Sequence, residues 1–391
     1  MALNEIEIPL SDAARRISIL GATGSIGKST TDLIRRNRDR FDVVAVTANR
    51  SAAELAALAR EFDAELAVVA DPSAYDALCE GLSGSGIEAA AGPEALTAAA
   101  GVSADLIVAG IVGAAGLDST LAAVGQGTLV ALANKESLVC AGDLVLAATE
   151  HSGTRLLPLD SEHNAIFQVF ETENAGDVEK LILTASGGPF RAWSRERMAA
   201  ATPAEAIAHP NWDMGRKISV DSATMMNKGL ELIEAAYLFP VGPDDIEVLV
   251  HPQSAVHSMV AYVDGSVLAQ LGSPDMRVPI AHALAWPARM ESPAARLDLA
   301  AIGSLEFEQP DHARFPAIEL ARNALSAGRG ATVILNAANE VAVERFLEGH
   351  IGFLGIADTV ARVLETVEGH EIGSLEDFRS LDRESRHAAE M

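Results

Sequence analysis

The sequence predicts an α/β chain: a doubly wound parallel sheet comes first, an α+β part follows, and a small helical part ends the chain. Three observations predict it. Short apolar segments alternate with helical patterns over the first 150 residues or so. Strand-like segments surround a tight Asp264-Gly265 turn further on. Beyond residue 316 the helical periodicity continues without a strand pattern. Strands that are apolar throughout are typical of a parallel sheet covered on both faces, and Asp-Gly is typical of a hairpin.

The N-terminal elements follow in regular alternation. Buried strands are expected at 16–20, 42–47, 66–70, 106–109 and 128–133. Helices are expected at 28–38 and 51–62, the second with Ser51 as its N-cap. Strand and helix in alternation indicate βαβ units, and hence the parallel sheet.

The later elements change character after about residue 155. Strands are expected at 181–185, 246–250, 256–262 and 266–271, with a helix at 229–239. Helices are expected at 317–325, 331–347 and 356–367. We therefore divide the chain into domains at 1–155 and 156–290, a linker at 291–316, and a helical domain at 317–391.

Composition narrows the class of partners. Lys and Arg number 29 and Asp and Glu 55, so the net charge is −26. Such a field repels phosphate backbones and anionic lipids, which argues against nucleic-acid and membrane partners. Only two cysteines are present, and the acidic N-terminus does not resemble a signal peptide. These features favour a cytoplasmic protein without a disulfide framework.

A glycine-rich motif joins the first strand to the first helix. It reads Gly21-Ala-Thr-Gly24-Ser-Ile-Gly27. Glycines in this context let a backbone approach a pyrophosphate at a helix N-terminus, which favours a Rossmann-like dinucleotide site over a purely structural turn. The second strand ends in Asn49-Arg50-Ser51, with an Arg and no acid. That end favours NADP over NAD, although an ordinary polar loop has the same composition.

Two polar segments follow later strands. Asn134-Lys135-Glu136 comes directly after a buried strand, at the edge where such sheets bind ligands. Lys135 there could handle a proton, or the segment could simply begin a solvated helix. Asp160-Ser161-Glu162 offers two carboxylates that share a side if the segment is extended, as a Mg²⁺ or Mn²⁺ site requires. Taken alone, that segment fits an acidic loop better.

A third polar region extends from residue 186 to residue 234. Its hydroxyl, amide and ammonium groups are of the kind that hold a phosphate, and they are Ser186, Ser222, Asn227 and Lys228. Glu231 and Glu234 are one helical turn apart. Trp212, between Pro210 and Gly215, suits a mobile lid. Each residue also has a structural interpretation, but their density in one region favours a site.

These motifs together resemble one enzyme family. The resemblance rests on Gly21–Gly27, Ala133–Glu136, Asp160–Asn164, Ser186–Phe190, His209–Trp212, the long run Met214–Gly229, His251–Ser254 and Leu335–Glu340. They are similar to 1-deoxy-D-xylulose 5-phosphate reductoisomerases from about residue 16 to the helical tail. The family rearranges this sugar phosphate and reduces the product to 2-C-methyl-D-erythritol 4-phosphate, a step of non-mevalonate isoprenoid biosynthesis. One departure is visible: the family usually has Gly-Lys-Asn where this chain has Asn49-Arg50-Ser51.

The resemblance implies roles for individual residues. Asp160, Glu162 and Glu231 would bind Mg²⁺ or Mn²⁺, and Lys135, Glu162 and Glu231 would be catalytic. The substrate would meet Lys135, Ser161, Glu162, Ser186, His209, Trp212, Ser222, Asn227, Lys228 and Glu231. NADPH would meet Thr23, Gly24, Ser25, Ile26, Asn49, Arg50, Ser51, Asn134, Glu136 and Gly215. The resemblance also implies a homodimer.

Three other functions compete with this interpretation. A metal-free NADP-dependent dehydrogenase would keep its activity in a chelator. A catalytically inactive NADPH sensor would bind the cofactor without turnover, and the three carboxylates and Lys228 argue against it. A structural oligomer would not need the 209–229 segment.

Overall fold

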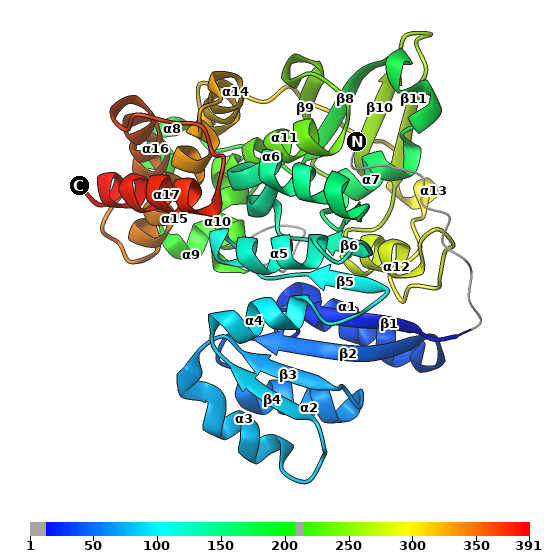
Figure 1. The fold of residues 1–391 in the computed structure, drawn as a ribbon. Coiled ribbons are helices and arrows are strands. Elements are labelled where there is room, and N and C mark those ends of the chain that lie inside the picture. The colour runs from blue at the N-terminus through cyan, green and yellow to red at the C-terminus, as the bar shows by residue number, and fades with distance from the viewer. Residues whose placement is uncertain (1–12, 209–214) are drawn as a thin grey trace. The chain divides into compact units, whose positions relative to one another are not determined.

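The computed structural model describes residues 13–208 and 215–391 (Figure 1). The chain divides into two units, each made of several segments. The first unit comprises 1–137, 145–164 and 276–294, and the second comprises 138–144, 165–275 and 295–391. Each unit contains a sheet of its own.

The sheet of the first unit is seven-stranded and parallel. Its strand order is β4-β3-β2-β1-β5-β6-β7, so the order reverses at β1. The strands are β1 Arg15–Leu20, β2 Phe41–Ala48, β3 Leu66–Val69, β4 Glu88–Ala91, β5 Leu106–Ala109, β6 Leu129–Leu132 and β7 Arg155–Pro158. All residues of β5 and β6 are buried, as the apolar segments predict. The doubly wound parallel sheet is therefore confirmed.

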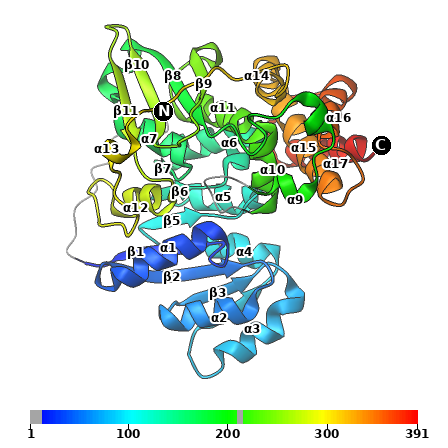
Figure 2. The same cartoon turned by 180° about the vertical axis from the view of Figure 1, so that it is seen from behind.

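Helices cover both faces of this sheet, as Figures 1 and 2 show from opposite sides. They are α1 Ser25–Arg36, α2 Ala52–Glu61, α3 Tyr75–Leu82, α4 Pro93–Ala100, α5 Leu117–Val124 and α12 Arg277–Ala285. α1 packs with α12, and α4 packs with α5. Crossovers between parallel strands are right-handed, so chains that advance in opposite directions from β1 place these two pairs on opposite faces. Ser51 is the N-cap position of α2, as expected.

Two helices contain residues of both units. They are α6 Lys135–Ser152 and α7 Ser161–Val169. α6 is interrupted at Ala141, whose backbone is not helical (φ −146°, ψ 36°).

The second unit contains a four-stranded mixed sheet and most of the remaining helices. The strands are β8 Val178–Ala185, β9 Ile246–Val250, β10 Val256–Tyr262 and β11 Val267–Leu271, in the order β11-β10-β8-β9. Only the β8–β9 pair is parallel. The helices are α8 Arg195–Ala199, α9 Pro203–Ala206, α10 Arg216–Thr224, α11 Met226–Leu238, α13 Leu299–Ile302, α14 Ala317–Ala327, α15 Ala331–Leu347, α16 Leu354–Thr366 and α17 Leu375–Glu390. α15, α16 and α17 pack on one another, which confirms a helical C-terminal region.

No helix within the described part of the chain combines the length and the apolar character that crossing a bilayer requires.

A neutral histidine is built into the first unit. The ring of His282 lies on α12, with its Nδ1 3.2 Å from the side-chain amide nitrogen of Asn164. That amide also donates to the carbonyl of Pro158 at 2.9 Å. Burial, aided by the charge of Arg289, lowers the pKa of His282 to about 4. The ring is therefore uncharged at neutral pH.

This histidine predicts a loss of stability in mild acid. Between pH 6.5 and about 4 the unfolded chain binds a proton that native His282 does not, so the free energy of unfolding falls as the pH falls. One such group contributes at most about 1.4 kcal/mol per pH unit. Urea unfolding of His282→Gln between pH 7 and 4.5 should show a shallower dependence than wild type. His350→Gln, at an exposed histidine, serves as control. Equal slopes for wild type and His282→Gln would contradict the prediction.

Candidate active site

Two glycines of the Gly21–Gly27 turn are required by packing at the point where the strand order reverses. Gly21 has φ +84°, and a Cβ there would lie 2.9 Å from the carbonyl oxygen of Gly110, which follows β5. A Cβ on Gly27 would lie 2.4 Å from backbone atoms of Ala22. Neither position accommodates a side chain, so the backbone turns tightly between β1 and α1.

Gly24 instead leaves the N-terminus of α1 open. It is the N-cap residue, it is exposed, and no side chain caps the helix there. The first turn of α1 carries no acidic residue. Backbone N–H groups at an uncapped helix start attract an anion such as a pyrophosphate. Four of the ten residues predicted to contact NADPH lie together at this turn, and they are Thr23, Gly24, Ser25 and Ile26.

The residues after β2 are exposed, and one of them has a partner that the sequence interpretation missed. Arg50 donates from Nε to Oδ2 of Asp71 at 2.5 Å. Hydrogen bonds from Ser73, with a further contribution from Arg50, lower the pKa of the Asp71 carboxyl. Asp71 follows β3, the parallel neighbour of β2. An acid just after the third apolar strand was the available signal, because neighbouring parallel strands end at one edge.

Lys135 and Asp160 are in contact because they too follow neighbouring parallel strands. β6 and β7 are parallel, with Leu132 opposite Pro158, so the segments that follow them lie at one edge. Lys135 is buried, and its Nζ donates to Oδ2 of Asp160. Asn134 caps α6 by accepting from the Ser137 N–H at 3.1 Å. The sequence left open a solvated helix start, but a buried ammonium group excludes that interpretation. Glu136 is buried beside it.

The segment that holds Asp160 and Glu162 is not extended. α7 begins at Ser161, and Oδ1 of Asp160 accepts from the Glu162 N–H at 3.2 Å, as a helix cap does. Ser161 donates from Oγ to Oε2 of Glu162 at 2.6 Å. The two carboxylates therefore lie at one helix start, and the alternation of an extended chain does not relate them. Asp160 caps instead of continuing β7 because its side chain satisfies a free N–H group.

In the second unit, close packing joins the loop after β8 to the end of α10. Gly188 has φ +65°, and a Cβ there would lie 2.6 Å from the carbonyl oxygen of Ser222. Ser186 accepts the Gly188 N–H at 3.2 Å through its hydroxyl. The predicted phosphate donors Ser186 and Ser222 therefore belong to segments in direct backbone contact.

The helix α11 carries the other predicted groups of the second unit. It starts after Met225, whose left-handed backbone (φ +64°) separates α10 from α11. Asn227 donates to Oε1 of Glu231, and Lys228 donates to Oε2 of the same carboxylate. Lys228 and Glu231 are both buried. A buried carboxylate needs such partners, because burying a charge without a partner costs roughly several kcal/mol of folding free energy.

The structure describes some of the remaining predicted residues. Gly215 is the exposed N-cap of α10. His209 and Trp212 lie outside the described residues. The buried Cys140 belongs to the core, as its setting predicted.

The carboxylates fit a hard divalent cation by their chemistry. Asp160 and Glu162 in the first unit, and Glu231 in the second, offer only oxygen ligands, which Mg²⁺ and Mn²⁺ prefer. Asp160 and Glu231 are each neutralised by a lysine ammonium group.

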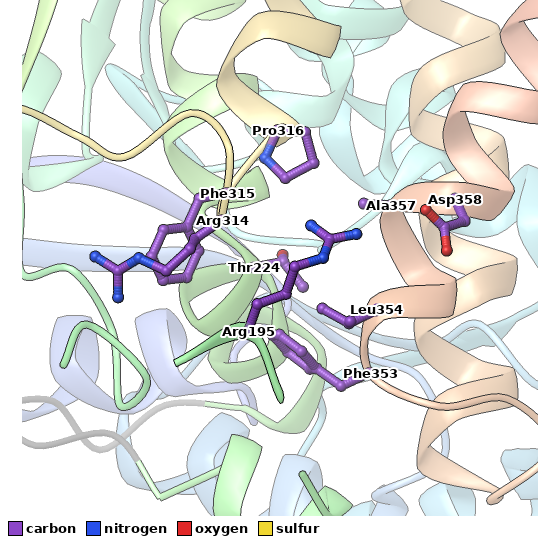
Figure 3. A pocket seen from close by; sticks show the side chains of 9 residues that line it. All are labelled: Arg195, Thr224, Arg314, Phe315, Pro316, Phe353, Leu354, Ala357 and Asp358. Carbon is purple, nitrogen blue, oxygen red and sulfur yellow. The ribbon is translucent and has the colours of Figure 1, made fainter. Parts of the chain in front are cut away.

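The second unit also contains two hollows away from the predicted residues. One, of about 20 Å³, is lined by Arg195, Arg314 and Asp358 among others (Figure 3). The Arg195 guanidinium points toward the side of Asp358, whereas that of Arg314 points away from it. Its volume suits about one water molecule. The other, of about 180 Å³, lies beside Cys140 and Tyr237. Neither is lined by a predicted site residue.

Comparison with known proteins covers almost the whole chain. A family described as 1-deoxy-D-xylulose 5-phosphate reductoisomerase matches residues 17–142. Its C-terminal domain matches 156–239, and a further DXP reductoisomerase C-terminal domain matches 271–388. A 1-deoxy-D-xylulose 5-phosphate reductoisomerase from Rhodospirillum centenum is 58% identical over 378 residues, covering 97% of this chain and 94% of the relative.

Solved structures agree with the sequence relatives. The reductoisomerase from Zymomonas mobilis, solved in complex with NADPH, has a TM-score of 0.92 and 54% identity, covering 96% of this chain and 98% of that one. A DOX-P reductoisomerase in complex with NADPH, fosmidomycin and magnesium has a TM-score of 0.91 and 45% identity, covering 96% and 97%. The chain therefore belongs to the 1-deoxy-D-xylulose 5-phosphate reductoisomerase family.

Proposed function

We propose that this chain rearranges 1-deoxy-D-xylulose 5-phosphate and reduces the product to 2-C-methyl-D-erythritol 4-phosphate, using NADPH and a divalent metal ion. The observation that carries the proposal is the family match, which spans nearly the full length of the chain. The two buried lysine–carboxylate pairs lie inside the matched segments. Isoprenoid biosynthesis is the route in which the product is used.

NADPH binds at the edge of the first unit's sheet. The open start of α1 receives the pyrophosphate, because its N–H groups lack a capping side chain. Asn49, Arg50 and Ser51 receive the 2′-phosphate of the adenosine end, with Arg50 supplying the positive charge. Asn134, Glu136 and Gly215 contact the cofactor elsewhere. The relative from Zymomonas mobilis was solved with NADPH, which supports this assignment.

Asp160, Glu162 and Glu231 hold the divalent ion, which is Mg²⁺ or Mn²⁺. When bound, the ion supplies a Lewis acid for the ketone and neighbouring hydroxyl oxygens of the substrate, and NADPH supplies the hydride. Related structures contain magnesium, which supports that ion directly. Manganese rests on the carboxylate chemistry alone.

The chain's own residues bind and orient the sugar phosphate. Ser186, Ser222, Asn227 and Lys228 hold the phosphate, since their hydroxyl, amide and ammonium groups donate to oxygens. Ser161 and His209 contact the sugar, and Trp212 excludes water above it. Lys135, buried against Asp160, holds a proton near the reacting oxygens. The ammonium groups also reverse the local field in a chain of net charge −26.

The chain forms a homodimer through β11. Within the described residues, β11 pairs only with β10 and carries exposed apolar side chains at Val267 and Leu268. Val263, in the adjoining turn, is 66% exposed. An open apolar strand at a sheet edge favours pairing with a second copy.

Three further assignments complete the proposal. The protein acts in the cytoplasm, and it has neither nucleic-acid nor membrane partners, in keeping with its charge and its two cysteines. The domain division at 155, 290 and 316 also stays a prediction.

The direct test follows NADPH absorbance with purified protein. NADPH oxidation should require both 1-deoxy-D-xylulose 5-phosphate and Mg²⁺ or Mn²⁺, and excess chelator should abolish it, because the metal ligands are essential to the reaction. Restoring the metal should restore the rate. Oxidation that persists in chelator would favour a metal-free dehydrogenase. NADPH binding without turnover would favour the sensor.

The metal assignment predicts the behaviour of Glu231→Gln. Removing the charge of this carboxylate should lower kcat at least about 100-fold, since a metal ligand and the partner of Lys228 are both lost. NADPH should still bind with the affinity of wild type, as fluorescence titration can measure. Glu247→Gln, which breaks a pair with Lys180 near the surface of the same unit, is the matched control. Near wild-type activity of Glu231→Gln at saturating metal would refute the site.

The dimer assignment predicts the effect of charge at β11. A Val263→Lys/Val267→Lys double variant should sediment at the mass of one chain, 40.8 kDa, because the charged side chains repel a second copy. Wild type should sediment at twice that mass. Val112→Lys, at another exposed apolar residue, is the control. A double variant that remains dimeric would exclude β11 from the interface.

A further inference from the structure

The residues after β2 and β3 run side by side in the first unit. β2 and β3 are parallel, with Ala48 opposite Val69. Beyond the paired residues, the Ala70 N–H donates to Ala48 O at 2.8 Å, and the Asp71 N–H donates to Asn49 O at 3.1 Å. The backbone thus continues the sheet pairing into the loops. Asp71 and Arg50 are therefore held next to each other by main-chain hydrogen bonds as well as by their charges.

The Asp71 carboxylate is fixed, and both of its oxygens are used. Oδ1 accepts from the Ser73 N–H at 2.9 Å, which caps the short helical turn Pro72–Ala74. Oδ2 accepts from Nε of Arg50 at 2.5 Å. The Asp71 side chain is only 17% exposed, whereas that of Arg50 is 78% exposed. The carboxylate is thus the anchored member of the pair.

This arrangement holds the Arg50 guanidinium by one nitrogen. Within the described residues, Nε is the nitrogen of Arg50 that has a protein partner. The two terminal nitrogens keep their hydrogens for another acceptor, and this pair of nitrogens matches a phosphate group with two parallel hydrogen bonds. The carboxylate that binds the ribose hydroxyls of NAD in such sheets lies at the end of the second strand, where this chain has Asn49-Arg50-Ser51, whereas Asp71 follows β3. Asp71 is poorly placed for that contact, because both of its oxygens face a protein donor and its side chain is only 17% exposed.

We propose that Asp71 is a positioning residue for cofactor selectivity: it orients Arg50 toward the 2′-phosphate of NADPH and is itself kept from the ribose of NADH. The proposal rests on the proposed function, in which Asn49-Arg50-Ser51 binds the adenosine end. Asp71 does not touch the cofactor. It acts through the direction of the guanidinium, which an untethered arginine side chain would occupy only part of the time.

A matched pair of variants separates orientation from charge. Asp71→Asn keeps a single acceptor oxygen, which can serve either the Arg50 Nε or the Ser73 N–H, and it removes a negative charge near the phosphate. Asp71→Ala removes both. The dissociation constants of NADPH and NADH are measured by fluorescence titration of the full chain, and those of adenosine 2′,5′-bisphosphate and 5′-AMP by calorimetry.

Asp71→Ala should raise the dissociation constants of NADPH and of the bisphosphate about three- to tenfold, the order expected for one oriented charge-assisted contact. NADH and 5′-AMP should change less than twofold. Asp71→Asn should weaken NADPH binding less than Asp71→Ala does, because one acceptor oxygen remains. If the ratio of the NADPH and NADH dissociation constants is unchanged in Asp71→Ala, the proposal is overturned. An equal weakening of both cofactors would also overturn it, because Asp71 would then only support the loop.

Arg50→Ala distinguishes this proposal from the function on which it rests. It should weaken NADPH at least about tenfold and leave NADH unchanged or tighter, since a carboxylate oxygen becomes available to the ribose. If Arg50→Ala leaves NADPH binding unchanged, the adenosine-end assignment itself fails. If Arg50→Ala weakens NADPH and Asp71→Ala does not, only the role of Asp71 is refuted.

Discussion

The pairing of buried ammonium and carboxylate groups is the constraint on which the candidate site residues of each unit depend. Taking one such charge out of water costs roughly several kcal/mol of folding free energy unless a partner of opposite sign accompanies it. Lys135 therefore requires Asp160, and Lys228 requires Glu231. The backbone must therefore hold the two members of each pair next to each other. In the first unit parallel neighbouring strands do so, and in the second a single helical turn does so.

Glycine and left-handed backbone set how closely the polar segments of the second unit approach each other. Gly188 packs on the carbonyl of Ser222 at a distance that excludes any side chain. Met225, though not glycine, adopts a left-handed conformation between two helices. A non-glycine residue in that conformation costs of order 1 kcal/mol, and the buried contacts of α10 and α11 offset it. The strain separates the helix that bears Ser222 from the one that bears Asn227 and Lys228.

Sequence patterns predicted the fold best where burial alone determines structure. The strands at β5, β9 and β10 were predicted with their observed bounds, because each is a continuous apolar or alternating segment. β4, with the sequence Glu-Ala-Ala-Ala, was not singled out, since alanine has little strand propensity and pairing with β3 decides its conformation. The helix α17 was also not singled out, although Ser374 caps it by accepting from the Asp377 N–H.

Predictions about the site differ in the same way. The Lys135 segment had a clear place at a strand end, but its burial depends on Asp160, 25 residues later in the chain. The Arg50–Asp71 contact was missed because the acid belongs to the next strand. The extended geometry assumed for Asp160 and Glu162 was wrong, since an oxygen that could cap a helix took that role. Sequence spacing therefore identified the groups, and tertiary pairing decided their geometry.

The second unit's sheet has one edge that is partly paired. Glu308 pairs with Val250 through two backbone hydrogen bonds of 2.9 Å, so the last residue of β9 already has a backbone partner. A sheet with two open edges can add strands in both directions, and the product is a polymer without a fixed size. A sheet with one open edge stops after a single addition. The bridge at Glu308 thus removes one pair of hydrogen-bonding groups from the β9 edge, so strand addition to this sheet is favoured at the β11 edge.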